Sequence, residues 1–366
     1  MDHRIIISGN SRICIGKDAL RELNRVLNYS PGKRSALFVL ADENTIRNCL
    51  PIANDQVKRI RDAELIEIKS GEENKTIETC TAIWRRLSGI GAGRDSILIN
   101  LGGGVIGDMG GFAASAFKRG IRFINIPTTL LSQVDASVGG KLGIDLDNLK
   151  NEVGFFNEPT DVFICPQFLE TLPAREKISG FAEVIKHALI ADKNYWAELV
   201  SQFTNPLSAR DWSPVIIRSI EIKSSIVKKD PLEKGIRKSL NFGHTIGHAL
   251  ESWSLEGVGI RLLHGEAIAI GMICEAYLSV LKCKFNKILL DEISSFILHI
   301  FKRVNLDAFD DVRLIELMRH DKKNKDGKIN FTLISAIGEP KTDRNCDANE
   351  IRKALLYFRE RSKLPA

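Results

Sequence analysis

The sequence predicts an α/β domain with a mostly parallel sheet, followed by a mainly α-helical domain. The chain has 366 residues, which exceeds the size at which one hydrophobic core usually stops growing, so two domains are expected. Short β-rich runs alternate with helical patterns in the first half, as in parallel sheets. Beyond Pro166 the apolar residues recur at helical spacing with few strand-like stretches. We therefore expect an α/β domain over residues 1–170 and a helical domain over residues 171–366.

The expected strands are runs of β-branched and aromatic residues that end at turn-forming residues. Six such runs occur, at Arg4–Ser8, Ser35–Leu40, Leu65–Lys69, Ser96–Leu101, Phe123–Pro127 and Asp161–Cys165. A helix is expected over Lys75–Leu87. In the second half, helical periodicity extends over Ala174–Leu199, Pro214–Lys229, Asn241–Trp253 and Glu266–Leu281. The domain boundary near Pro166–Pro173 predicts a ligand-binding cleft between the two domains.

The composition is that of an ordered globular protein and argues against several classes. Hydrophobic residues make up 44% of the chain and charged residues 27%, as in ordinary folded domains. The net charge of +6 is not concentrated in a basic block, so a small anion is a better ligand than nucleic acid. The seven cysteines form no C-x-x-C pair, which argues against disulfides and a thiolate zinc site. Without a secretory signal or a long apolar run, we expect a cytoplasmic protein with no membrane partner.

A glycine-rich turn follows the expected strand Ser96–Leu101. Residues 102–108 are GGGVIGD, which matches G-x-G-x-x-G between an expected strand and an expected helix. Amides without a neighbouring Cβ can approach a pyrophosphate at a helix N-terminus, although such a turn also serves simple helix–strand packing. The strand Phe123–Pro127 does not end in an acidic ribose ligand, so Asp42 is the candidate for that role. We therefore expect a Rossmann-like variant that binds a dinucleotide.

Side chains that bind metals occur in three segments of the helical half: Glu183, the pair His244 and His248, and His264. Two imidazoles and one carboxylate leave an open position on a zinc ion, as a catalytic site requires. His244 and His248 are four residues apart and share a helix face, so both could bind the ion or one could transfer protons. Spacing does not decide between His248 and His264. A single histidine is more often a core residue, but this clustering favours a site.

Basic residues flank the glycine-rich and histidine-containing segments, which predicts an anionic substrate. A phosphate together with a carboxylate calls for several Lys or Arg donors in one cleft. Any one of these lysines is more often a solvated surface residue, so only the group is informative. Its members are Lys141, Lys150, Lys186, Lys223, Arg237, Lys322 and Lys323.

Four segments together resemble the 3-dehydroquinate synthase family: PTTLLSQVDASVGGK at 127–141, AEVIK at 182–186, LNFGHTIGHA at 240–249 and HGEA at 264–267. The resemblance extends in the same order from residue 71 to residue 323. It implies a homodimer with an N-terminal NAD domain and a C-terminal helical domain that binds zinc or cobalt. It also implies conversion of 3-deoxy-D-arabino-heptulosonate 7-phosphate to 3-dehydroquinate and phosphate in aromatic amino acid biosynthesis. The implied steps are transient oxidation by NAD, phosphate elimination, re-reduction and aldol cyclisation.

The resemblance also implies roles for residues at the matching positions. The metal ligands would be Glu183, His244 and His264, and His248 would transfer protons or contact substrate. NAD would lie along Asp42, Asn44, Gly71, Glu72, Glu73, Asn74, Lys75, Gly104, Val105, Ile106, Gly107, Asp108, Thr128, Thr129, Lys141, Lys150, Phe168, Leu169, Glu170 and Thr171. Substrate would contact Asp135, Lys141, Asn151, Lys186, Lys223, Arg237, Asn241 and either Lys322 or Lys323, with Arg119 acting across the dimer.

Three other functions are alternatives to this one. A related sugar phosphate cyclase, of the 2-deoxy-scyllo-inosose or epi-valiolone type, would differ only in its substrate. A net polyol dehydrogenase would accumulate NADH with an alcohol, whereas the cyclase releases phosphate without net NADH. A catalytically inactive binding or scaffold protein would have lost metal ligands, and here all three are present. Departures from the family pattern bear on substrate specificity and occur at Leu142, Asp145, His187, Ala188 and Pro231.

Overall fold

The computed structural model describes residues 3–28, 35–146, 149–256, 261–301, 306, 309–319 and 329–363. Contacts divide the chain into two compact units. The first consists of Met1–Pro173 with Asp211–Leu232, and the second of Ala174–Arg210 with Glu233–Ala366. The segment Asp211–Leu232, which the sequence placed in the helical domain, thus groups with the first unit.

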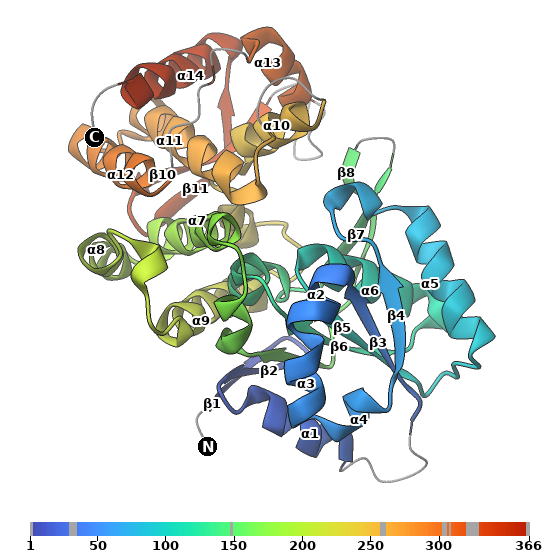
Figure 1. Ribbon diagram of the computed structural model, residues 1–366. Helices are drawn as coiled ribbons and strands as arrows, with labels where there is room; N and C mark the ends of the chain where they lie inside the picture. Colours follow the sequence, from blue (N-terminus) through green and yellow to red (C-terminus); the bar gives the residue numbers. More distant parts are fainter. Residues whose placement is uncertain are drawn as a thin grey trace. The chain divides into compact units, whose positions relative to one another are not determined.

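The first unit is built on a seven-stranded sheet with the order β1-β2-β9-β6-β5-β3-β4 (Figure 1). β1 pairs antiparallel with β2, and the remaining neighbours are parallel. The strands are β1 (His3–Ser8), β2 (Ser11–Gly16), β3 (Leu37–Asp42), β4 (Glu64–Ile68), β5 (Ile97–Gly102), β6 (Arg122–Pro127) and β9 (Asp161–Ile164). The six predicted strands are all present, and β2 is an addition.

Helices cover both faces of this sheet because its strands are apolar on both sides. Along β3, Leu37 and Val39 belong to a core shared with α1, α3 and α4, whereas Phe38 and Leu40 belong to a core shared with α5 and α6. The helices of the unit are α1 (Ala19–Asn28), α2 (Glu43–Asn48), α3 (Leu50–Gln56), α4 (Lys58–Arg61), α5 (Ile77–Gly89), α6 (Gly104–Ala116) and α9 (Ser213–Lys229). Shorter turns occur at Glu72–Asn74, Phe117–Arg119, Ser132–Ala136 and Pro166–Glu170.

The carboxyl ends of the neighbouring strands β3 and β5 form a topological switch point. The chain leaves β3 towards the face covered by α1, α3 and α4, and it leaves β5 towards α6 on the opposite face. In open α/β sheets, ligands bind in the crevice outside such a point. The glycine-rich turn at residues 102–107 begins there, as the Rossmann-like prediction requires.

A hairpin that was not predicted lies between β6 and β9 in the sequence. Its strands, β7 (Lys141–Leu146) and β8 (Leu149–Phe156), pair antiparallel and pack on α6. A Cβ on Gly111 of α6 would lie 2.4 Å from a methyl group of Leu142, so the helix approaches the hairpin closely at a glycine. This hairpin carries three of the expected ligand contacts, at Lys141, Lys150 and Asn151.

The second unit is mainly helical, as predicted. Its helices are α7 (Ala174–Ala191), α8 (Lys193–Gln202), α10 (His244–Leu255), α11 (His264–Cys283), α12 (Lys287–Ile300), α13 (Asp311–Arg319) and α14 (Ala348–Lys363), with short turns at Pro206–Ser208 and Ile236–Asn241. The expected helix over Ala174–Leu199 is two helices, because the side chain of Asp192 accepts the N–H groups of Asn194 and Tyr195 and starts α8. The antiparallel hairpin of β10 (Ile329–Ala336) and β11 (Glu339–Cys346) was not predicted.

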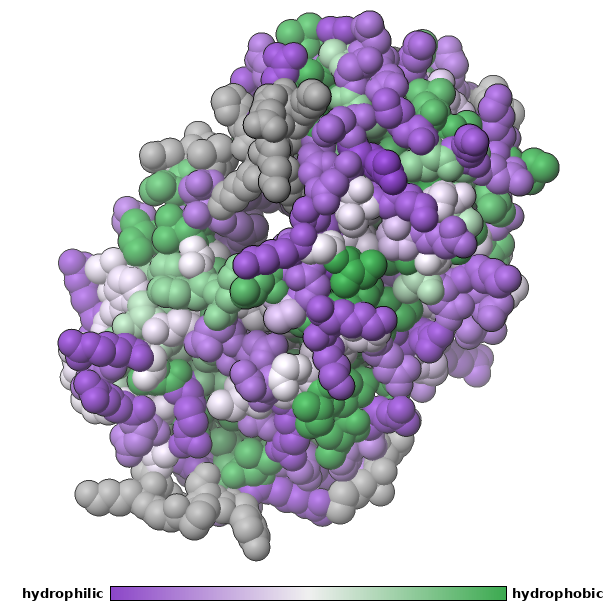
Figure 2. Space-filling model, turned by 180° about the vertical axis from the view of Figure 1, so that it is seen from behind, coloured by the Kyte–Doolittle hydropathy of each residue, from purple (hydrophilic) through white to green (hydrophobic). Residues whose placement is uncertain are grey.

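On the face in Figure 2, hydrophilic residues are interspersed with small hydrophobic patches, as is usual for globular proteins. Within the described residues, no helix combines the length and the apolar character needed to cross a bilayer.

Candidate active site

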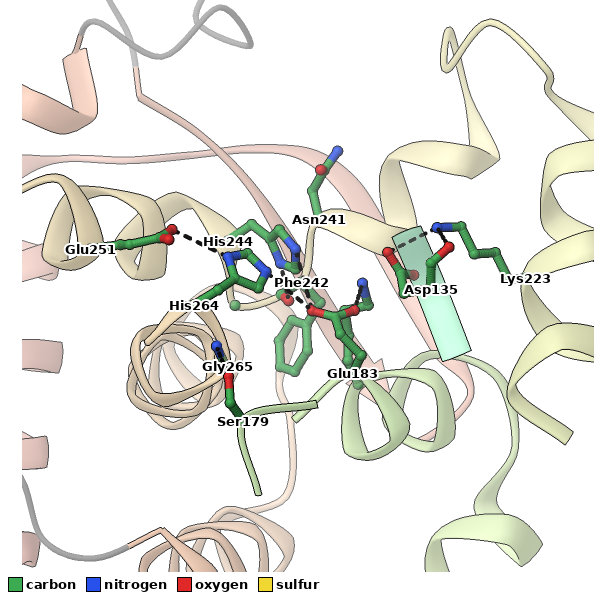
Figure 3. A network of polar contacts seen from close by, with 12 residues as sticks. Asp135, Ser179, Glu183, Lys223, Asn241, Phe242, His244, Glu251, His264 and Gly265 are labelled. Atoms are coloured by element: carbon green, nitrogen blue, oxygen red, sulfur yellow. Dashed lines mark hydrogen bonds and ion pairs between the residues drawn. The ribbon is translucent and has the colours of Figure 1, made fainter. Parts of the chain in front are cut away.

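Glu183, His244 and His264 meet at one place in the second unit (Figure 3). Glu183 is fully buried on α7, while His244 and His264 are the first residues of α10 and α11. Glu183 Oε1 lies 3.6 Å from His244 Nε2 and 3.7 Å from His264 Nε2. Ligand atoms at zinc-like bond lengths and tetrahedral angles lie about 3.3 Å apart. The three side chains therefore have the spacing needed to bind one divalent ion.

Both imidazoles are oriented through their Nδ1 atoms. His244 Nδ1 lies 3.1 Å from the carbonyl oxygen of Phe242, and His264 Nδ1 lies 3.2 Å from Glu251 Oε2 (Figure 3). When each Nδ1–H donates to its acceptor, the Nε2 lone pair faces Glu183, which is the tautomer of a metal ligand. Burial lowers the pKa of His264, but the carboxylates of Glu251 and Glu183 outweigh it and raise that pKa to about 10. A metal ion that binds this ring therefore displaces a proton.

Close helix packing at glycines brings the three ligands together. A Cβ on Gly265 would lie 1.8 Å from the carbonyl oxygen of Ser179 on α7, and the Gly265 N–H donates to Ser179 Oγ at 3.0 Å. A Cβ on Gly271 of α11 would lie 1.9 Å from the carbonyl oxygen of Gly243, which precedes α10. Because these neighbours are backbone atoms that have little freedom to move, glycine is the residue that fits at both crossings.

Lys186 and His248 lie beside the three ligands. Lys186 is buried one turn after Glu183 on α7, and its Nζ forms an ion pair with Glu183 Oε2. The His248 ring centroid lies 5.0 Å from that of His244 and 5.8 Å from that of His264. Among the described residues, the metal-compatible group that contains Glu183 and His244 includes His264 rather than His248. His248, Glu251 and His264 form a second such group, so the choice of Glu183, His244 and His264 as the ligands stays a prediction.

Glu251 was not among the site residues expected from the sequence. It lies on α10 seven residues after His244 and three after His248, so the three side chains share one helix face. That i, i+4, i+7 spacing was the signal available in the sequence. A carboxylate that accepts the second N–H of a metal-binding histidine fixes the orientation of the ring and raises its basicity.

Replacing Glu251 with glutamine is expected to weaken metal binding about 10- to 100-fold, because His264 Nδ1–H loses its charged acceptor. Competition with a chromophoric chelator measures this affinity. Glu256→Gln is the matched control, because Glu256 follows α10 and its side chain pairs with Arg313. Unchanged metal affinity in Glu251→Gln would show that Glu251 does not support the ligand.

Most expected dinucleotide contacts lie at the carboxyl ends of strands in the first unit. Asp42 ends β3, residues 71–75 follow β4, residues 104–108 follow β5, Thr128 and Thr129 follow β6, and residues 168–171 lie beyond β9. The chain segments are far apart in sequence, but the parallel strands bring their ends to one edge of the sheet. Asp42 also caps α2, because its Oδ1 accepts the N–H groups of Asn44 and Thr45.

The start of α6 has the features of an anion site. Its N-cap residue, Gly103, contributes no side-chain acceptor to the first helical N–H groups. A depression beside it is lined by Asn100, Gly102, Gly103, Gly104, Gly107, Asn125, Pro127, Ser132, Ala136 and Ser137. A Cβ on Gly107 would meet no atom within 4 Å, so the space beside this residue is open. The positive end of a helix and its N–H groups suit a pyrophosphate.

Lys75 connects several expected ligand contacts. Its buried Nζ donates to Asp108 Oδ2 at 2.5 Å and to Asn151 Oδ1 at 2.6 Å. Burial lowers the pKa of Lys75, but the carboxylates of Asp108 and Glu72 outweigh it and raise the pKa above its usual value. Lys150 Nζ lies 3.6 Å from Glu72 Oε1. The hairpin β7–β8 is thus tied to the start of α6 by a charged lysine.

A second pair of expected substrate residues meets in the same unit. Lys223, on α9, donates to the carbonyl oxygen of Asp135 at 2.7 Å, and its Nζ lies 2.8 Å from Asp135 Oδ2 (Figure 3). Lys141 is exposed at the start of β7. Arg119 has φ 68°, between Lys118 at 51° and Gly120 at 107°, which places two non-glycine residues in the left-handed region.

The remaining expected substrate contacts belong to the second unit. Arg237 is buried in the turn Ile236–Asn241, and Asn241 Nδ2 donates to Glu233 Oε1 at 2.6 Å. Lys322 and Lys323 lie outside the described residues. The expected site residues therefore lie in three local groups. One surrounds the metal ligands, one surrounds Lys75, and one consists of Asp135 and Lys223.

Two family models together match most of the chain. The model described as 3-dehydroquinate synthase N-terminal matches residues 65–179, and the model described as 3-dehydroquinate synthase C-terminal matches residues 180–324. The chain belongs to the 3-dehydroquinate synthase family. A 3-dehydroquinate synthase of Parabacteroides distasonis is 43% identical over 95% of this chain and 98% of that protein. One of Ruminiclostridium cellulolyticum is 38% identical over 94% of this chain and 95% of that protein.

Solved structures of sugar phosphate cyclases share the fold. A 2-deoxy-scyllo-inosose synthase complexed with carbaglucose-6-phosphate, NAD⁺ and Co²⁺ is 26% identical, with a TM-score of 0.82 over 98% of this chain and 99% of that chain. A 2-epi-5-epi-valiolone synthase from Streptomyces hygroscopicus, with NAD⁺ and Zn²⁺ bound, has the same TM-score at 24% identity over 97% of this chain and 98% of that chain. A probable glycerol dehydrogenase from Sinorhizobium meliloti is more distant, at 15% identity and a TM-score of 0.62 over 99% of this chain and all of that chain.

Proposed function

We propose that this chain converts 3-deoxy-D-arabino-heptulosonate 7-phosphate to 3-dehydroquinate and phosphate, as a 3-dehydroquinate synthase dependent on NAD and a divalent metal ion. The observation that carries the proposal is the convergence of Glu183, His244 and His264 from three separate helices. It occurs in a chain that relatives named 3-dehydroquinate synthase match over nearly its whole length. The nearest alternative, an inosose-type cyclase, has the support of a solved structure that is 26% identical to this chain.

The residues present fit both expected cofactors. Two Nε2 atoms and a carboxylate oxygen form a donor set typical of catalytic zinc, and cobalt accepts the same set. Bound there, the ion would act as a Lewis acid that polarises substrate hydroxyl groups. The glycine-rich turn and the open helix start suit a dinucleotide, and NAD bound there would accept a hydride and later return it.

The residues of the chain would bind the substrate and handle its charge. Lys186, Lys223 and Arg237 supply the positive charge that recognition of a phosphate and a carboxylate requires. Positive charge also stabilises the departing phosphate, which becomes more negative as its bond to carbon breaks. His248 lies beside His244 and His264, where its imidazole would transfer protons to or from the substrate. Asp135 and Asn241 would orient substrate hydroxyl groups through hydrogen bonds.

A homodimer is part of the proposal, with Arg119 serving the site of a second copy. Supporting it, the backbone holds Lys118 and Arg119 at positive φ, which costs about 1–2 kcal/mol per non-glycine residue. Such strain is often retained where a side chain must be presented in one direction. Light scattering on the assayed protein gives its mass, and a monomer at assay concentration would rule the dimer out.

The experiment that tests the function is phosphate release from the heptulosonate phosphate, with and without NAD⁺ and a metal chelator. We expect release only when NAD⁺ and metal are both present, with no net NADH, because the hydride is returned within each turnover. Phosphate release from a hexose 6-phosphate instead would identify the chain as an inosose-type cyclase. Steady NADH accumulation with a polyol would identify a dehydrogenase.

A further inference from the structure

Glu275 is a fully buried acidic residue on α11 to which the proposed reaction gives no role. Its Oε2 accepts the N–H of Gly243 at 2.6 Å. Its Oε1 accepts the N–H groups of Thr245 at 3.0 Å and Ile246 at 3.2 Å. These three donors flank His244 in the sequence, so the carboxylate holds the backbone on both sides of a metal ligand.

The start of α10 requires such an acceptor. Gly243, its N-cap residue, has φ 83° and contributes no side-chain acceptor. The first four N–H groups of a helix have no partner within the helix, and here the first intrahelical bond runs from Gly247 N–H to the Gly243 carbonyl. Glu275 therefore acts, from a neighbouring helix, as an N-terminal capping group. A carboxylate suits this place because the helix dipole and charge-assisted hydrogen bonds both favour negative charge.

One face of α11 organises both imidazole ligands. His264 and Glu275 are eleven residues apart, which is about three helical turns, so their side chains share a face. Gly271, one turn before Glu275, allows α11 to approach the Gly243 carbonyl. The same face of α11 thus carries His264 directly and, through Glu275, holds the backbone that carries His244.

We propose that Glu275 is a positioning residue of the metal centre, which sets the backbone from which His244 reaches the ion. The inference rests on the proposed metal site. A carboxylate accepts hydrogen bonds at both oxygens, whereas a glutamine amide accepts at one and would turn an NH₂ group towards a backbone N–H. The backbone around His244 would then move, and ligand geometry tolerates shifts of only about 0.5 Å.

The test is Co²⁺ titration of the metal-stripped full chain, followed by visible absorption. In Glu275→Gln we expect Co²⁺ affinity about 10- to 100-fold below wild type, as for other residues that support a ligand, together with an altered spectrum. Ser279→Ala is the matched control. Ser279 lies one turn further along α11, where its buried Oγ donates to the backbone carbonyl of Glu275 at 2.7 Å and accepts the N–H of Ile334 at 3.0 Å. It does not contact the Glu275 carboxylate. This variant should have a lower Tm but wild-type Co²⁺ affinity, which separates positioning from general stability.

Wild-type affinity and spectrum in Glu275→Gln would overturn the inference and leave the metal site intact. Failure of the wild-type chain to bind Co²⁺ would instead overturn the metal site itself. If circular dichroism shows that Glu275→Gln is unfolded, Glu275→Asp takes its place, because it keeps the charge but shortens its reach. Reduced Co²⁺ affinity in folded Glu275→Asp supports the inference. Wild-type Co²⁺ affinity in Glu275→Asp shows that Glu275 has a structural role only. If Glu275→Asp is also unfolded, the role is again structural only.

Discussion

Glu183→Gln is expected to lose metal binding and activity together. The change removes the only carboxylate of the group formed with His244 and His264 within the described residues. Loss of a residue that merely supports a ligand costs about 10- to 100-fold, so loss of the ligand itself should exceed about 100-fold in metal affinity. Metal content after dialysis and phosphate release measure the two effects. Full activity in the metal-depleted variant would refute the assignment of this site.

That experiment needs a control for loss of folding, because Glu183 also neutralises the charge of buried Lys186. Breaking a buried ion pair from one side typically lowers the free energy of unfolding by about 3–5 kcal/mol. The double variant Glu183→Gln, Lys186→Met should regain stability, as measured by chemical denaturation, without regaining metal. Glu176→Gln, on the same helix outside the metal-ligand group, should retain both metal and activity.

Gly265→Ala is expected to destabilise the second unit and to weaken metal binding in the same variant. The added methyl group would stand 1.8 Å from the Ser179 carbonyl oxygen, and neither α7 nor α11 can relieve the contact by rotating a side chain. Overpacking of this kind costs about 1–3 kcal/mol or more. Because Glu183 and His264 lie on these two helices, separating them also spreads the ligand atoms. Chemical denaturation and chelator competition measure the two effects.

Gly89→Ala is the control for the glycine substitution. Gly89 is the last residue of α5, and a Cβ there would meet no atom within 4 Å. Alanine at an unobstructed helical position is neutral or stabilises by up to about 1 kcal/mol. Wild-type stability and metal affinity in both variants would mean that the contact between α7 and α11 does not set the site.

The parts of the fold that the sequence predicted correctly have strong local signals. The six predicted strands have apolar runs bounded by turn residues, and the glycine-rich turn follows β5 as expected. The β7–β8 hairpin was missed because its strands mix glycine and charged residues with apolar ones, so their pairing depends on packing against α6. The segment Asp211–Leu232 groups with the first unit by its contacts, which the sequence did not predict because helical periodicity does not show which core a helix joins.

Residues that support the metal ligands were harder to find than the ligands. Glu183, His244, His248 and His264 stand out as metal-compatible side chains, and resemblance to the family favoured His264 over His248 as a ligand. Glu251 was detectable in principle from its spacing on α10. Glu275 was not, because an acidic residue in an apolar helix acquires its role only from the N–H groups that another helix presents to it.

By itself the sequence determined the order and type of most elements, the donor atoms available to a metal ion, and the family of the chain. Those properties depend on residue type and local periodicity, which are read along the chain. Tertiary structure alone decided which side chains face one another, including the approach of α11 to α7 and α10 and the acceptors of His244 and His264. These contacts depend on how closely helices distant in sequence can pack, and at this site that distance is set by glycines meeting backbone atoms.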